Sequence, residues 1–104
     1  MNRYALCLST ALLVVTPLSA YANKALADKN GCLGCHATAT KLVGPAYKDV
    51  AAKYADQADA TKMLAKSIRA GGTGKWGEMA MPPQAQLTEA DAQKLAAWIL
   101  GGAK

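Results

Sequence analysis

Two cysteines and a histidine stand together in the run Cys32-Leu33-Gly34-Cys35-His36. Two cysteines three residues apart lie on one side of a helical turn, where both thiols can form thioether bonds to the vinyl groups of a haem. The next residue, His36, can then bring its imidazole to the iron from the same side. The sequence therefore predicts one covalently bound haem c, attached through Cys32 and Cys35, with His36 as an axial ligand.

Other uses of cysteine and histidine fit this chain less well. A structural zinc site needs four ligands, usually in two separated pairs, but after residue 22 the chain contains only Cys32, Cys35 and His36. A thioredoxin-like redox pair needs a βαβ context, and the neighbouring residues show no strand pattern. Haem attachment is the favoured interpretation.

The sixth ligand position of such an iron needs its own candidate, and Met81 is the first choice. A thioether is a soft, neutral ligand, and His/Met ligation raises the reduction potential. Met81 precedes Pro82-Pro83, and this stiff pair can hold a loop ligand in place. Met79 is a rival in the same loop, whereas Met63 has apolar neighbours in an expected helix, which favours core packing. Met81 could also be only an apolar loop residue.

Residues 1–22 have the pattern of a secretory signal peptide. Arg3 gives a positive start, residues 4–15 are predominantly apolar, and Ala-Tyr-Ala at residues 20–22 offers a cleavage site. The apolar stretch is shorter than the roughly 20 residues of a membrane-spanning helix, so cleavage is favoured over a retained anchor. We therefore expect a periplasmic protein with one mature domain, residues 23–104.

The chain is mildly basic. It has 12 Lys and Arg against 7 Asp and Glu, a formal net charge of +5, and one of the cations, Arg3, leaves with the expected leader. A small basic excess suits docking to acidic protein surfaces. It is too weak and too dispersed to indicate nucleic-acid binding.

Helical periodicity runs through the mature region, and no segment alternates with period two. The pattern predicts helices over residues 24–35, 46–54 and 58–70, and a last helix that starts after Thr88 and stops at Gly101-Gly102. Pro45 is expected to be the first residue of the second helix. The expected inward residues are Tyr47, Val50, Ala51, Tyr54, Met63, Leu64, Ile68, Leu95, Trp98 and Ile99. The predicted fold is all-α, with Met81 in a long loop of the kind that usually has a function.

The order of these motifs resembles that of bacterial class I monohaem cytochromes c, of the cytochrome c-551/c-552 (c8) type. The haem-attachment run is followed by Val43-Gly44-Pro45-Ala46-Tyr47, Trp76-Gly77, Met81-Pro82-Pro83 and a helix with Trp98. The likeness covers the whole of residues 23–104. It implies four or five helices wrapped around one covalently bound haem in a soluble periplasmic electron carrier.

The resemblance also implies roles for residues around the haem. The carbonyl of Pro45 is expected to accept a hydrogen bond from the proximal histidine, which orients the imidazole. The indole N–H of Trp76 is expected to donate to a haem propionate, with a plain hydrophobic contact as the alternative. Two positions depart from the family pattern: Ala80 stands where proline often precedes the ligand methionine, and Ser67 stands where many relatives have a basic residue. Arg69 is the candidate to replace that basic residue at the propionate.

The function implied is one-electron transfer through a haem edge near Cys32 and Cys35, with no substrate on the iron and no enzymatic activity. Compatible partners are a quinol-oxidising complex on the donor side and a terminal oxidase, nitrite reductase or peroxidase on the acceptor side. We expect a monomer without a membrane anchor and without nucleic acid. The alternatives are an open-site haem enzyme or gas sensor, and a haem subunit of a larger redox complex. Lysines that could steer acidic partners are Lys29, Lys41, Lys48 and Lys75.

The polypeptide core of so small a domain is thin, and a haem would fill its centre as a large apolar plate. We therefore predict that the haem-free protein is largely unfolded. Circular dichroism during heating measures this directly, and a cooperative thermal transition in haem-free protein would contradict it.

Overall fold

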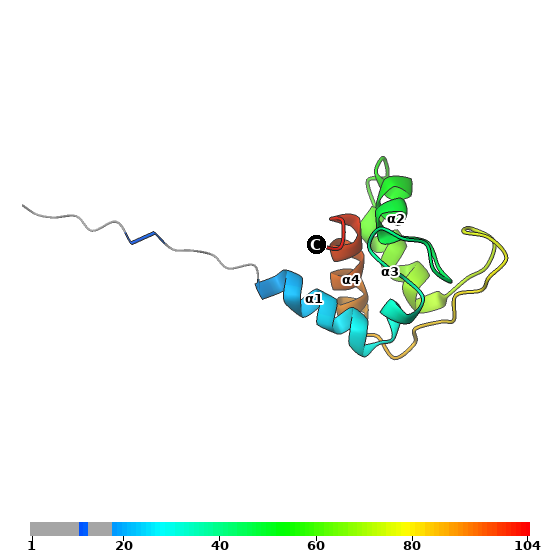
Figure 1. Ribbon diagram of the computed structural model, residues 1–104, viewed down its shortest axis with the longest axis horizontal. Coiled ribbons are helices and arrows are strands. Elements are labelled where there is room, and N and C mark those ends of the chain that lie inside the picture. Colours follow the sequence, from blue (N-terminus) through cyan, green and yellow to red (C-terminus); the bar gives the residue numbers. More distant parts are fainter. Residues whose placement is uncertain (1–10, 13–17) are drawn as a thin grey trace, which may run out of the picture.

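The structure, a computed structural model, describes residues 11–12 and 18–104. Its elements are α1 (Leu18–Lys29), the short 3-10 helix η1 (Cys32–Gly34), α2 (Tyr47–Tyr54), α3 (Ala60–Ala70) and α4 (Glu89–Leu100) (Figure 1). Within the described residues the only β-type pairing is an isolated bridge between Gly72 and Met81. The prediction of an all-α fold is confirmed.

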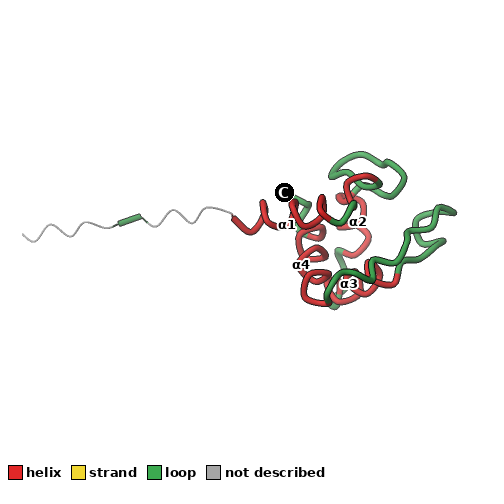
Figure 2. The backbone as a smooth tube through the Cα atoms, turned by 90° about the horizontal axis from the view of Figure 1, so that it is seen from below, coloured by secondary structure: helices red, strands yellow, loops and turns green. Residues whose placement is uncertain are grey.

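Helix α4 is the centre of the fold because α1, α2 and α3 all pack against it. Its side chains Ala92, Leu95, Ala96 and Ile99 recur at helical spacing and are buried. The two alanines are small enough to let neighbouring helices come close, while Leu95 is only 1% exposed and fills the space between them. The 71–88 loop leaves this helical cluster and extends to one side (Figure 2).

Side-chain hydrogen bonds mark the start of α4 and the end of α1. The hydroxyl of Thr88 accepts a hydrogen bond from the backbone N–H of Asp91 at 3.1 Å and so caps the N-terminus of α4, the helix that the sequence predicted to start after Thr88. At the C-terminal end of α1, the side-chain amide of Asn30 donates to the Leu26 carbonyl at 2.8 Å. The same carbonyl also accepts from the backbone N–H of Asn30 at 3.2 Å, so Asn30 closes the end of α1 through both of its N–H donors.

Several predicted boundaries differ from the structure. The expected helix over residues 24–35 begins earlier, at Leu18, and ends at Lys29, because Asn30-Gly31 breaks it before η1. Pro45 is not the first helical residue, since Ala46 is the N-cap of α2. Helix α3 begins at Ala60 instead of residue 58.

One of the predicted inward residues of α3 is wrong. Met63 is 42% exposed, and Ala65 is buried on the inward face together with Leu64 and Ile68. Met63 and Ala65 lie about 200° apart around the helix, so only one of them can face the core.

Most of the predicted signal peptide, residues 1–22, lies outside the described residues, and helix α1 begins within its last part. Across residues 11–12 and 18–104, no helix has the length and apolar character needed to cross a membrane.

We predict that Leu95→Ala lowers the free energy of unfolding of the haem-bound protein by about 2–5 kcal/mol, because it leaves a cavity at the centre of the core. Denaturant unfolding followed by circular dichroism measures the loss. Met63→Ala is the matched control on the exposed face of α3, with an expected loss below about 1 kcal/mol. Equal losses in the two variants would contradict the central role of Leu95.

Candidate functional site

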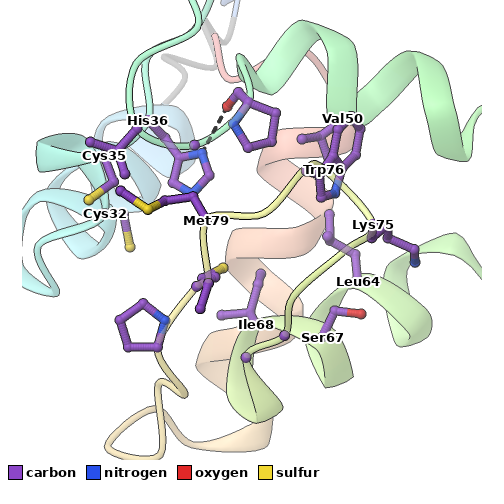
Figure 3. Close-up of a pocket in the computed structure, with 18 of the residues that line it drawn as sticks. Cys32, Cys35, His36, Val50, Leu64, Ser67, Ile68, Lys75, Trp76 and Met79 are labelled. Carbon is purple, nitrogen blue, oxygen red and sulfur yellow. Dashed lines mark hydrogen bonds between the residues drawn. The ribbon is translucent and has the colours of Figure 1, made fainter.

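A cavity of about 340 Å³ opens between the helical cluster and the loops. Its volume lies within the range of about 300–1,000 Å³ that is usual for small-molecule and cofactor sites. Residues from η1, the 43–47 segment, α2, α3, the 71–82 segment and α4 line it (Figure 3). Aliphatic side chains supply much of the wall: Val43, Val50, Leu64, Ile68, Leu95 and Ile99.

The two thiols stand with the histidine at one wall of this cavity (Figure 3). The backbone N–H groups of Cys35 and His36 both donate to the carbonyl of Cys32, at 3.2 and 2.9 Å. This tight turn, rather than an α-helix, brings the three side chains together. Both cysteines are free; Cys35 is exposed, while Cys32 is half-buried and its burial raises the pKa of its thiol.

The imidazole of His36 is held by the backbone of Pro45. Its Nδ1 lies 2.8 Å from the Pro45 carbonyl oxygen, the bond drawn as a dashed line in Figure 3. A carbonyl oxygen only accepts, so Nδ1 carries the proton and Nε2 keeps a lone pair that can bind a metal. The backbone supports this contact, because the N–H of Gly44 donates to the Cys35 carbonyl at 2.7 Å.

Close packing leaves the His36 ring little freedom. A Cβ atom added at Gly44 would lie 2.8 Å from Nδ1 and 2.9 Å from Nε2 of His36, so only glycine fits at this position. The ring stacks on Tyr47 with centroids 5.1 Å apart and planes at 15°. Tyr47 in turn meets the edge of Trp98 at 5.6 Å. Burial raises the pKa of Tyr47 above its ordinary value, which keeps its hydroxyl neutral.

Met81 is anchored by its backbone to the start of the loop. Its N–H donates to the Gly72 carbonyl at 2.8 Å, and its carbonyl accepts from the Gly72 N–H at 3.1 Å. The chain packs so closely here that a Cβ atom at Gly71 would lie 2.7 Å from the Pro83 nitrogen. The Met81 side chain is partly buried against the core cluster and lines the cavity.

The rival methionines are placed differently. Met79 also lines the cavity, and its side chain reaches toward the His36 wall (Figure 3), but it is 70% exposed. Met63 lies on the exposed face of α3 and does not line the cavity.

The structure does not bring all of the remaining predicted site residues together. Trp76 lines the cavity, and so does Ser67. Arg69 does not: it is exposed and lines a separate depression with Lys66 and Glu89. Residues two apart on a helix point about 200° away from each other, so when Ser67 faces the cavity Arg69 faces away. The expectation that Arg69 replaces the missing basic residue therefore does not fit the structure.

Two residues of the site were not recognised from the sequence as parts of it. Lys75 lines the cavity, and its Nζ donates to the Tyr54 hydroxyl at 2.6 Å. Gly44 is the residue that gives the imidazole its space. Each could have been found from its neighbour in the sequence, since Lys75 directly precedes Trp76 and Gly44 directly precedes Pro45, and both neighbours were predicted site residues.

The chain is similar to known proteins in both sequence and fold. Residues 21–103 match the cytochrome c family. The chain is 51% identical over 92 residues to cytochrome c-552 of Nitrosomonas europaea, a match that covers 88% of this chain and 87% of that protein. It is 47% identical over 102 residues to cytochrome c-551 of Pseudomonas aeruginosa, covering 96% and 97%. The crystal structure of wild-type Nitrosomonas europaea cytochrome c552 aligns with a TM-score of 0.73 at 52% identity, covering 76% of this chain and 98% of that one.

A small helical fold with two thiols and an imidazole on one wall of an apolar cavity defines a haem-binding electron-transfer protein. The chain belongs to the cytochrome c family, and its relatives place it among the bacterial class I cytochromes of the c-551/c-552 type. It carries one covalently attached haem c and is an electron-transfer protein, not an enzyme. The cavity fits this group, since its wall offers two thiols, one imidazole lone pair and a largely aliphatic lining.

We predict that Gly44→Ala displaces the His36 ring and lowers the free energy of unfolding of the haem-bound protein by about 1–3 kcal/mol, because the added methyl overlaps the imidazole. Denaturant unfolding measures the loss, and the NMR signal of the His36 Nδ1–H reports the displacement. In the control Gly101→Ala the nearest atom is 3.4 Å away, so little change is expected. An unshifted Nδ1–H signal in Gly44→Ala would refute the prediction.

Proposed function

We propose that the chain is a soluble periplasmic one-electron carrier, with haem attached through Cys32 and Cys35 and iron ligated by His36 and Met81. The observation that carries the proposal is that two anchored residues, His36 and Met81, line the same cavity. The His36 ring is committed to Pro45 through Nδ1, and the Met81 backbone is paired with Gly72. The haem supplies the one-electron chemistry when bound; the chain supplies its ligands and surroundings.

Anchored ligands suit electron transfer because the ligand set then stays the same in both oxidation states. The Pro45 carbonyl keeps the imidazole in one orientation and increases its basicity as a ligand. A neutral thioether from Met81 stabilises ferrous iron over ferric iron and so raises the reduction potential. The aliphatic wall residues, such as Leu64 and Ile68, exclude water and keep the site in a low dielectric.

Met81 is preferred to Met79 on packing grounds. The Met81 side chain is already partly buried against the core, so ligation costs it little desolvation or ordering. Met79 is 70% exposed in a part of the loop that is held less closely. An exposed methionine loses more side-chain freedom when it binds.

Trp76 is proposed to donate its indole N–H to a haem propionate. Its position at the cavity supports this role. The ammonium of Lys53 lies 4.6 Å from the centroid of the Trp76 ring, which braces the ring by a cation–π contact.

The proposed partners are acidic redox proteins that dock briefly at the exposed side of the site. Cys35, Val43 and Met79 line the cavity and are also exposed, and an apolar patch of this kind within a basic molecule suits a small, transient interface. A quinol-oxidising complex is the donor class we propose, and a terminal oxidase, nitrite reductase or peroxidase the acceptor class. We propose a monomer in solution without a membrane anchor.

We predict that the oxidised haem protein shows the weak far-red charge-transfer band of methionine bound to ferric iron. Met81→Ala should abolish this band because the proposed ligand sulfur is lost, whereas Met79→Ala should keep it. Visible spectra of the oxidised and reduced proteins, expressed with periplasmic export, measure both outcomes.

The same spectra decide against the proposal if the wild-type protein is high-spin and its ferrous form binds carbon monoxide at neutral pH. That result would favour the open-site alternative. Loss of the band in Met79→Ala and its retention in Met81→Ala would assign the ligand to Met79.

A further inference from the structure

Lys75 is the one charged side chain, among the described residues, that lines the cavity beside the haem-attachment group. The other titratable lining residues are Cys32, Cys35, His36, Tyr47 and Tyr54. The first three are assigned to the haem, and a tyrosine side chain cannot supply a positive charge. No acidic residue and no other lysine or arginine of the described chain lines this cavity.

A bound haem brings two carboxylates to the site, and carboxylates near an apolar cavity need a partner. Helix α3 offers none, because Ser67 is uncharged and Arg69 lies at a separate depression. A counter-charge on the protein must therefore come from another element, and Lys75 is the cation that the cavity contains.

Lys75 is held in place by two adjacent residues of α2, Lys53 and Tyr54. Its Nζ donates to the Tyr54 hydroxyl at 2.6 Å and lies 4.8 Å from the centroid of that ring. Its carbonyl accepts a hydrogen bond from the Lys53 Nζ at 3.3 Å. Helix α2 thus fixes both the backbone and the ammonium group of this loop residue (Figure 3 shows Lys75 next to Trp76).

We infer that Lys75, positioned by Tyr54, is the counter-cation of a haem propionate in this protein and takes over the task that Ser67 and Arg69 cannot perform. The inference rests on the proposed placement of the propionates near Trp76. A cation at this point opposes the extra positive charge of ferric iron and so raises the reduction potential. It also favours the ionised form of the propionate and lowers the pH at which that carboxyl titrates.

The test compares three variants of the haem-bound protein with the wild type. Lys75→Gln removes the charge, Lys75→Arg keeps it, and Lys66→Gln removes one charge at the separate depression on α3. The ferric-to-ferrous ratio is measured at pH 8 against a redox dye held at a fixed ratio. Lys75→Gln should shift the ratio toward ferric by about two- to fivefold, the size expected of a partly exposed charge pair. Lys66→Gln should shift it less, and Lys75→Arg should stay near the wild-type value.

A pH series adds a second readout. The fall of the potential that accompanies propionate ionisation should move to higher pH in Lys75→Gln, because the ionised carboxylate has lost its partner. Tyr54→Phe keeps the ring but removes the hydroxyl anchor, and should shift the ratio in the same direction by a smaller amount.

Equal shifts in Lys75→Gln and Lys66→Gln, with an unchanged pH series, would overturn the inference, since Lys75 would then act only as one surface charge among others. The far-red methionine band should persist in all of these variants. Its absence in the wild-type protein would instead refute the ligation by Met81, so the two failures are distinguishable.

Discussion

The hydrogen bond from His36 Nδ1 to the Pro45 carbonyl, 2.8 Å long, is the interaction on which the site depends. It joins residues nine apart in the chain and selects the imidazole tautomer whose Nε2 can bind a metal. The bond forms only because Gly44 leaves room for the ring and pairs with the Cys35 carbonyl. The imidazole is thus oriented by backbone geometry, which supports a site that needs little rearrangement when haem is bound.

The same histidine connects the site to the core. Its ring stacks on Tyr47, and Tyr47 meets Trp98 of the central helix. Leu95 and Ile99 of that helix belong both to the core and to the cavity wall. Core and site therefore share side chains, which is the physical basis of the prediction that this small domain is stable with its cofactor and largely unfolded without it.

The sequence predicted well what depends on local pattern. Three of the four inward residues predicted for α2, those predicted for α4 and the start of α4 after Thr88 follow from spacing of a few residues, while Ala51 of α2 is only half-buried. The prediction was wrong where a residue's position depends on the rotation of a helix about its axis. Arg69 was expected at the haem and Met63 in the core, but the orientation of α3 turns both side chains away from the cavity. The role of Gly44 needed the position of a ring from another segment, which no local pattern contains.

The His36 side and the Met81 side of the site are held by different numbers of contacts. The His36 side has a side-chain hydrogen bond, an aromatic stack and tight backbone pairing within a short segment. The Met81 side depends on two backbone bonds between Gly72 and Met81, and beyond them the loop is largely exposed. A loop of this kind has a lower cost of local opening than the packed helices. Since Met79, Lys75 and Trp76 all lie on this loop, sequence changes that tune the potential can gather there without disturbing the histidine side.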